Sequence, residues 1–438
     1  MFYRNVKKWM AGTLCVAMVC GLAACGQQGN GANAQNIHGI QATGNTQGVE
    51  VTDDGSEPSK VVVVDEQESR RQLQDFSYKL LEQNLALENP VLSPVSAYFA
   101  MGLAGLGARG ETKSEFDKVL GADLESYPQK LMNVLECDTK NMQVDLANSA
   151  WVDEAFTPSK DWMKATEVFY KAEAFKEKLS TEQTLKKINN WVEDETEGLI
   201  PGFLGEPLGT DVRLALLNTV YFDGKWDLPF DAESTYQEEF TTKDNQKVMV
   251  DMMQMYLEYQ QYLKNDIAEG VVLPYEDQKY SFVALKPTDG NTVREMYEQL
   301  SMEEIFTLLD NKQEKMVNLW LPKFEITFDQ ILNNSLTNMG LTKAFSAEEA
   351  DFSGIGATDS GNSLYISLVR QKAVVKVDEE GTEAAAVTVV MMKDGCAIME
   401  DKPIDLFFDE PFFYMIVENE TKTPLFMGIL DKPVSGDM

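Results

Sequence analysis

Histidine, the side chain that most hydrolases use to activate a nucleophile, occurs once in the 438 residues, as His38. It lies in a stretch rich in Gly, Asn and Gln, which we do not expect to join a folded core. Ser-His-Asp and Cys-His hydrolases need an imidazole beside the nucleophile, and most catalytic zinc sites use histidine ligands. The sequence therefore predicts no enzyme of these classes, and it gives no sign of a metal or a cofactor.

Two other patterns are similar to chemical sites. Gly105, Gly107 and Gly110 have the spacing of a dinucleotide-binding loop, which has meaning only after a strand. The residues before them repeat with helical periodicity, so a helix end is the better interpretation. Acidic clusters at 348–351 and 378–383 could supply a carboxylate pair for acid-base catalysis. Because Asp and Glu total 71, chance clustering in solvated loops explains them better.

The most informative pattern begins at Gly381, where small residues are followed by a run of strand-forming residues without proline. A segment that enters the middle of a formed sheet needs small side chains first and strand preference afterwards. As a permanently exposed loop, the same run would be an aggregation hazard. Alternate side chains of a strand share one face. The face that begins at Thr382 carries only small or apolar residues: Thr382, Ala384, Ala386, Thr388, Val390 and Met392.

The N-terminal region has the organisation of an export signal. Basic residues precede an apolar run at 9–24, which is short for a membrane span, so we expect residues 1–24 to be a signal peptide. The run ends Leu-Ala-Ala-Cys25, which is similar to the bacterial lipobox, whose cysteine is lipidated and anchors the protein to a membrane. We therefore expect a cell-surface lipoprotein outside the cytoplasm. An ordinary signal with an incidental cysteine would instead give a secreted protein.

Composition sets the remaining limits. The polar stretch 25–65 cannot bury enough surface to fold, so we interpret it as a flexible tether. The whole chain is 44% hydrophobic, which is enough for a packed core. The net charge of −33 repels a phosphate backbone and excludes nucleic acid as a partner. Cys137 and Cys396 could form one disulfide, but we expect two free thiols.

A folded domain, called the body below, must position these segments, and the sequence also predicts its helices and strands. Ser69 and Gln72 have capping-box spacing, so the ordered body should begin near residue 66. Helices gather early and strands late, which favours an α+β fold with mostly antiparallel or mixed sheets. Expected helices lie at 94–107, 112–120, 160–170 and 183–197. Expected strands lie at 214–222, 280–286, 316–328, 364–377 and 404–430.

Six segments, in the same order along the chain, resemble motifs of the serpin family. They are residues 89–96, 217–226, 272–275, 321–324, 340–345 and 423–428. The resemblance implies one serpin domain over 66–438, with three β-sheets, about nine helices and an exposed reactive-centre loop.

Residues 375–388 closely resemble the hinge of inhibitory serpins. The resemblance implies a monomeric inhibitor rather than an enzyme, acting as a suicide substrate: a protease cuts the loop, and the freed segment inserts into the main sheet and traps it. A non-inhibitory, binding or chaperone-like surface protein is the alternative. The implied hinge residues are Glu379, Glu380, Gly381, Thr382, Glu383, Ala384, Ala385, Ala386 and Thr388.

The scissile bond has two candidate positions. The family's usual hinge length, counted from Gly381, places it at Gly395-Cys396 or Cys396-Ala397, which we favour. Counting back from the C-terminal strands places it near Glu400-Asp401. A small residue there implies an elastase-like serine protease, or less readily a cysteine protease. Lys393 keeps a trypsin-like target open, and Met399 a chymotrypsin-like one.

The resemblance also implies which residues control opening of the main sheet. These shutter and breach residues are Ser93, Ser96, Asn218, Trp226 and Gln371. The family often has a histidine where this chain has Gln371, which is a departure. Its amide could still form hydrogen bonds near Ser93, Ser96 and Asn218.

Overall fold

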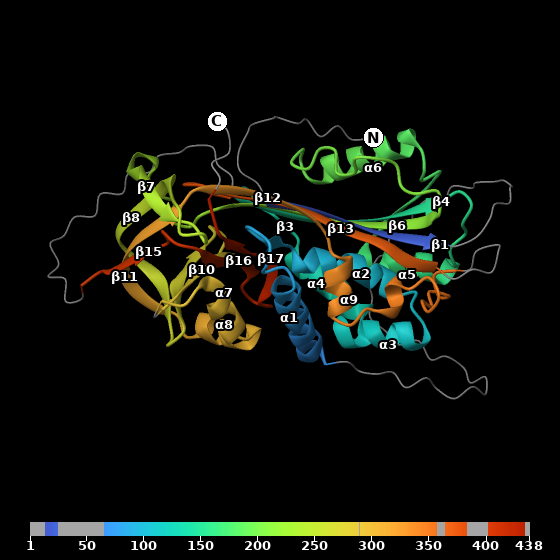
Figure 1. Cartoon of the computed structure of the whole chain (residues 1–438), viewed down its shortest axis with the longest axis horizontal. Coiled ribbons are helices and arrows are strands. Elements are labelled where there is room, and N and C mark those ends of the chain that lie inside the picture. Colours follow the sequence, from blue (N-terminus) through green and yellow to red (C-terminus); the bar gives the residue numbers. More distant parts are fainter. Residues whose placement is uncertain (1–13, 25–64, 289, 357–363, 383–401, 434–438) are drawn as a thin grey trace.

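The structure is a computed structural model that describes residues 14–24, 65–288, 290–356, 364–382 and 402–433 (Figure 1). These residues form nine α-helices and seventeen strands. The helices are α1 Glu66–Glu82, α2 Pro94–Gly105, α3 Gly110–Val119, α4 Ser126–Leu135, α5 Lys160–Tyr170, α6 Glu182–Glu195, α7 Val293–Gln299, α8 Met302–Asp310 and α9 Asn333–Asn338.

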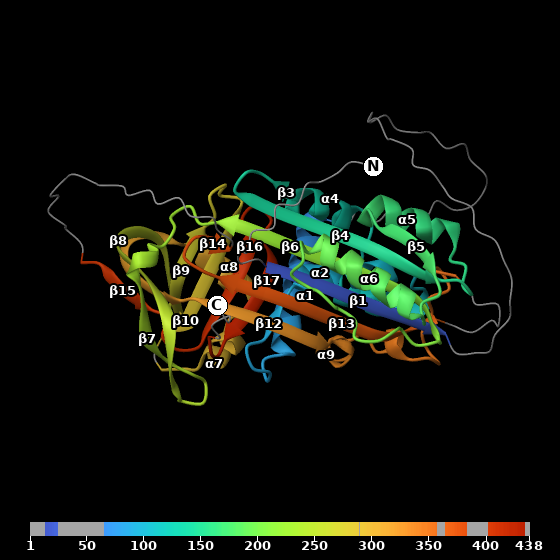
Figure 2. The same ribbon diagram turned by 90° about the horizontal axis from the view of Figure 1, so that it is seen from above.

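One sheet has eight strands in the order β12-β13-β1-β6-β4-β3, with β14 paired to β6 and β5 to β4. It is called the largest sheet below because the remaining nine strands divide into two smaller sheets. Its centre is the long β6, flanked by β4 on one side and β1 on the other (Figure 2). The strands are β1 Leu14–Ala24, β3 Cys137–Asp138, β4 Met142–Asp153, β5 Glu173–Glu177, β6 Val212–Lys225, β12 Phe324–Ile331, β13 Leu364–Val377 and β14 Gly381–Thr382.

The other nine strands are hydrogen-bonded in the order β15-β11-β8-β9-β10-β16-β17-β2, with β7 paired to β8. Leu257 in β8 has a φ of 56°, and the pairing of β8 with β11 shifts register beside it. This bulge divides the set into one sheet around β8 and another around β16. The strands are β2 Val91–Leu92, β7 Thr235–Thr241, β8 Lys247–Lys264, β9 Ala268–Pro274, β10 Tyr280–Pro287, β11 Gln313–Pro322, β15 Ile404–Phe407, β16 Phe412–Glu418 and β17 Thr423–Leu430.

Helices cover both faces of the largest sheet. Helix α6 lies alone over one face, where Ile188 and Trp191 pack on Leu217 of β6 in a small core (Figure 1). Helices α1, α2, α4 and α5 lie on the opposite side, below the sheet in Figure 1, and their buried side chains belong to the main core. The α+β class, the three sheets and, over the described residues, the nine helices match the sequence prediction.

Two local predictions need correction or confirmation. The first helix begins at Glu66, while Leu14–Ala24 lies in the largest sheet as β1. This helix is capped by Asp65, whose carboxylate accepts from the amide of Gln67. Ser69 instead lies buried within the helix, so the capping box was wrong. Gly105 ends α2, so a helix and not a strand leads into it, which confirms a helix end rather than a nucleotide loop. A Cβ on Gly105 would lie 2.6 Å from Leu124, so tight packing explains this glycine.

Candidate functional site

The predicted hinge begins where β13 ends, beside the C-terminal end of β6. The amide of Asp378 donates to the carbonyl of Gly381 over 3.1 Å, which closes a tight turn. Gly381 has a φ of 143°, and an added Cβ would lie 2.3 Å from the carbonyl oxygen of Gly224. Only glycine fits this turn, so the position of Gly381 in the sequence reflects a real backbone requirement.

Glu379 ties the hinge to the body. Its carboxylate accepts a hydrogen bond from Lys323 Nζ at 2.8 Å and another from Thr235 Oγ1 at 2.9 Å. Burial by itself would raise the pKa of Glu379, but the hydrogen bonds from Lys323 and Thr235 outweigh it and hold the pKa below its usual value. Burial is the main reason that the pKa of neighbouring Asp378 is raised. The acidic cluster here is thus a structural anchor, and its carboxylates are not a catalytic pair.

Trp226, one of the predicted shutter and breach residues, contacts the start of the hinge. Its indole Nε1 donates to the carbonyl of Asp378 at 3.0 Å, and its backbone amide donates to the carbonyl of Glu380 at 3.0 Å. The ring stacks on Tyr275, with centroids 4.7 Å apart. This side chain therefore fixes where the chain turns into the sheet.

The gap between β13 and β6 holds a strand that is antiparallel to both. That strand is β1, whose Cys15 lies opposite Val374 on one side and Tyr221 on the other. The largest sheet therefore has a central lane between β13 and β6. This lane holds one strand of eleven residues, which pairs through its backbone on both sides.

The described end of the hinge lies in line with this lane. Strand β14 pairs Thr382 with Gly224 of β6. Counted one residue at a time from that pair, Ala385 would come opposite Tyr221. Counted from the Asp378–Gly381 turn, Ala385 would also come opposite Val374. Both counts lead to the position of Cys15, so the hinge and β1 share one lane of the sheet.

The shutter residues flank this lane halfway along. Gln371 is fully buried, and its amide accepts from the amide of Ser93 at 3.2 Å and donates to the carbonyl of Ser93 at 2.9 Å. Gln371 therefore forms a hydrogen-bonded contact with Ser93, at a position where the family often has a histidine. Gln371 and Asn218 lie opposite Met18 from either side.

Asn218 is also fully buried, but its bonding is incomplete. Its Nδ2 donates to Asn148 Oδ1 at 3.0 Å and, at 3.3 Å, to the carbonyl of Ala147. Its Oδ1, like the hydroxyl of Ser96, has no hydrogen-bond partner within the described residues. A buried amide oxygen left in this state costs free energy that a donor entering the lane could recover.

The structure brings some of the predicted site residues together, beside partners that the sequence did not suggest. The predicted residues Glu379, Glu380, Gly381 and Trp226 do meet at one end of the lane, but Lys323 and Thr235 carried no signal linking them to the hinge. Other predicted residues lie outside the described part of the chain: Cys25, Glu383, Ala384, Ala385, Ala386, Thr388, Lys393, Gly395, Cys396, Ala397 and Met399. Cys137 forms no disulfide with any described residue, and burial is the main reason that its pKa is raised to about 11.

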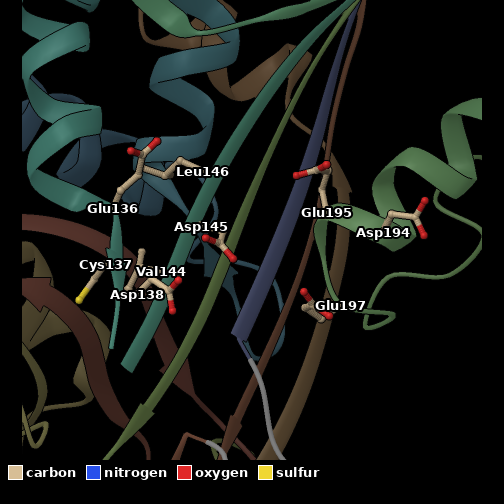
Figure 3. A pocket seen from close by; sticks show the side chains of 9 residues that line it. All are labelled: Glu136, Cys137, Asp138, Val144, Asp145, Leu146, Asp194, Glu195 and Glu197. Atoms are coloured by element: carbon tan, nitrogen blue, oxygen red, sulfur yellow. The ribbon is translucent and has the colours of Figure 1, made fainter. Parts of the chain in front are cut away.

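A cavity of about 430 Å³ lies between the β3–β4 strands and the end of α6 (Figure 3). Six carboxylates line it, and burial, followed by the charge of Glu173, raises the pKa of Glu195. No group of three or more potential ligands within the described residues has the arrangement to hold a metal ion. The carboxylates that line the cavity are Glu136, Asp138, Asp145, Asp194, Glu195 and Glu197.

None of the helices described is long and apolar enough to cross a membrane.

Residues 71–433 match the family model described as serpin, serine protease inhibitor. The chain belongs to the serpin family. Among serpins, alpha-1-antiproteinase F of Cavia porcellus is 31% identical over 390 residues, which cover 86% of this chain and 94% of that protein.

Solved serpin structures share the fold. The thermophilic serpin tengpin in its native state has a TM-score of 0.76 at 32% identity, over 86% of this chain and 97% of tengpin. Human thyroxine-binding globulin, solved with thyroxine, has a TM-score of 0.74 at 25% identity, over 84% of this chain and 99% of that protein. The family contains mostly protease inhibitors, together with members that bind other ligands.

Proposed function

We propose that this serpin inhibits a serine protease as a suicide substrate, by inserting its cleaved loop between β13 and β6. One observation carries the proposal: Thr382 already pairs with Gly224, and its continuation leads into a lane with backbone pairing on both sides. The residues that would follow have the small and then strand-forming side chains that such an entry requires.

The reaction uses the catalytic groups of the target and none of the serpin's own. The protease serine attacks a loop carbonyl, for which we favour Gly395; the peptide bond to Cys396 breaks, an ester to the protease forms, and the new amine takes a proton from the protease. The residues before the cut then enter the sheet and carry the protease with them. Misplacing catalytic groups by about 1 Å can cost roughly a hundredfold in rate, so the ester outlasts normal turnover.

The target and location are part of the same proposal. A Gly-Cys or Cys-Ala bond fits the small specificity pocket of an elastase-like protease, with Lys393 and Met399 offering trypsin-like and chymotrypsin-like alternatives. Lipidation of Cys25 after loss of residues 1–24 would hold a monomeric inhibitor on the outer side of a membrane, where such proteases act.

The experiment is to incubate the chain from residue 25 onward with elastase-like, trypsin-like and subtilisin-like proteases. We expect an adduct of inhibitor and protease that survives denaturing electrophoresis, together with a cut form that melts at a higher temperature than the intact one. Cleavage by all three classes without any adduct would reject inhibition. Cleavage without a rise in melting temperature would indicate a non-inhibitory binding protein instead.

A further inference from the structure

The strand that occupies the central lane is the N-terminal segment Leu14–Ala24. It carries no charged residue and no proline, and each of its two ladders has one register shift, between Gly21 and Leu22 toward β13 and between Leu22 and Ala23 toward β6. It pairs with β13 from Cys15 to Ala24 and with β6 from Leu14 to Ala23. The segment that sequence analysis assigned to a signal peptide therefore has a second structural capacity, as a fully paired sheet strand.

Side chains of this strand fill the same core that the loop would fill. Met18, Cys20 and Leu22 are each completely buried in the main core, on the side of the sheet that α2 covers. By the register that β14 sets, Thr388, Val390 and Met392 would take these three positions. Those are three of the six residues predicted to face inward.

The two strands exclude each other. Leu14 pairs with Phe222, and Thr382 pairs with Gly224, so β1 begins two residues further along β6 than the point where β14 ends. A single ladder position, opposite Asp223, separates them. From Phe222 to Val212, the positions along this side of β6 are taken by the N-terminal strand.

We propose that Leu14–Ala24 is an internal plug, which keeps the uncleaved chain from acting as an inhibitor until the segment is removed. While β1 is in place the loop has no lane to enter, so a protease that cuts the loop is released as from a substrate. Cleavage before Cys25 frees the lane and activates the inhibitor. The plug rests on the proposed inhibitory function, and its occupancy of the sheet can be measured without it.

Occupancy is tested with Cys20, since burial raises the pKa of its thiol and shields it from reagents. The full chain is made by membrane-free synthesis with Cys15, Cys25, Cys137 and Cys396 changed to serine, which leaves one thiol and removes the lipobox cysteine. We expect iodoacetamide to label the native chain at least about a hundredfold more slowly than the denatured chain. Labelling at the denatured rate would overturn the plug.

The proposed block of inhibition is tested by adding one charge to β1. Met18→Arg places a cation at a fully buried position, so it should expel the strand, restore rapid labelling of Cys20 and produce adducts with protease. Gln28→Arg adds the same charge after Ala24 and should leave both the protection and the block unchanged. Leu22→Glu gives the same test at a second buried position if Met18→Arg does not fold.

The outcomes separate the two proposals. Adduct formation by the unsubstituted full chain while Cys20 stays protected would reject the block. If Cys20 is protected, Met18→Arg exposes it, and neither this variant nor the chain from residue 25 forms an adduct, the plug stands and the inhibitory function fails.

Discussion

Thr388→Val tests the register of the inserted loop at a single atom. Counted from Thr382 opposite Gly224, residue 388 comes opposite Asn218, and counted from the hinge turn it comes opposite Gln371. The buried Oδ1 of Asn218 has no partner within the described residues, so the hydroxyl of Thr388 is placed to donate to it. Valine keeps the shape and removes the donor. Leaving a buried acceptor unpaired costs about 1–3 kcal/mol, and this cost should fall on the loop-inserted form alone.

The assay compares melting temperatures before and after loop cleavage, in the chain from residue 25 onward. For domains of about 150–250 residues, 1 kcal/mol shifts the melting temperature by about 2–4 °C, so a fall of a few degrees in the cleaved form is measurable. The intact form should not change, and Thr388→Ser, which keeps the hydroxyl, should recover most of the difference. Equal melting of cleaved Thr388→Val and cleaved wild type would show that residue 388 does not lie beside Asn218.

Three further predictions concern the hinge and the C-terminal anchor. Thr382→Arg should convert the inhibitor into a substrate, since a charge would have to enter the ladder opposite Gly224; electrophoresis should show cleavage without adduct, and unchanged inhibition would contradict the inward assignment. The lowered pKa of Glu379 means that its stabilisation is complete above its usual value of 4.5 and is lost as pH falls through the lower, folded-state pKa. Denaturant titrations over about pH 5 to pH 3 should therefore show a smaller loss for Glu379→Gln than for wild type. The pKa of Asp378 is raised mainly by burial, which the substitution keeps, and the charge of Glu379 is the smallest of its causes. Asp431, fully buried, accepts two hydrogen bonds from Arg294, at 2.6 and 2.8 Å, so Asp431→Ala should destabilise intact and cleaved forms alike by about 3 kcal/mol; a loss below about 1 kcal/mol would show that the pair is not a structural anchor.

Periodicity located the elements whose two faces differ most in burial. The strand predicted at 364–377 and the helix predicted at 160–170 have the bounds that the structure shows. Strand β8 was missed because methionine, glutamine and lysine, which have weak strand preference, make up much of Lys247–Lys264. The capping pattern at Ser69 and Gln72 is not the one that the structure uses, because α1 begins at Glu66 and is capped by Asp65.

The site could be predicted only as far as one strand carries its own signal. Alternation from Thr382 onward predicts an inward face, because side-chain direction in a strand depends on local sequence alone. The partners of the hinge, Lys323 and Thr235, lie 56 and 144 residues away along the chain, and only tertiary pairing brings them there. An apolar run such as Leu14–Ala24 has the same composition as a signal segment and as a buried strand, so sequence could not reveal its place in the sheet.

The length of the central lane bears on which of the two candidate bonds is cut. Among the described residues β13 begins at Leu364 and β6 at Val212, so an inserted strand in the hinge register would reach the described ends of both ladders at about residues 394–395. Cleavage at Gly395-Cys396 would let all the freed residues pair, and the protease would come to rest at the far end of the sheet. Cleavage at Glu400-Asp401 would leave about five residues beyond the last pair, a slack tether on which the protease active site need not be deformed. We therefore expect mass spectrometry of the adduct to release a C-terminal fragment that begins at Cys396 or Ala397. A fragment that begins at Asp401, in an adduct of equal lifetime, would show that lane length does not select the bond.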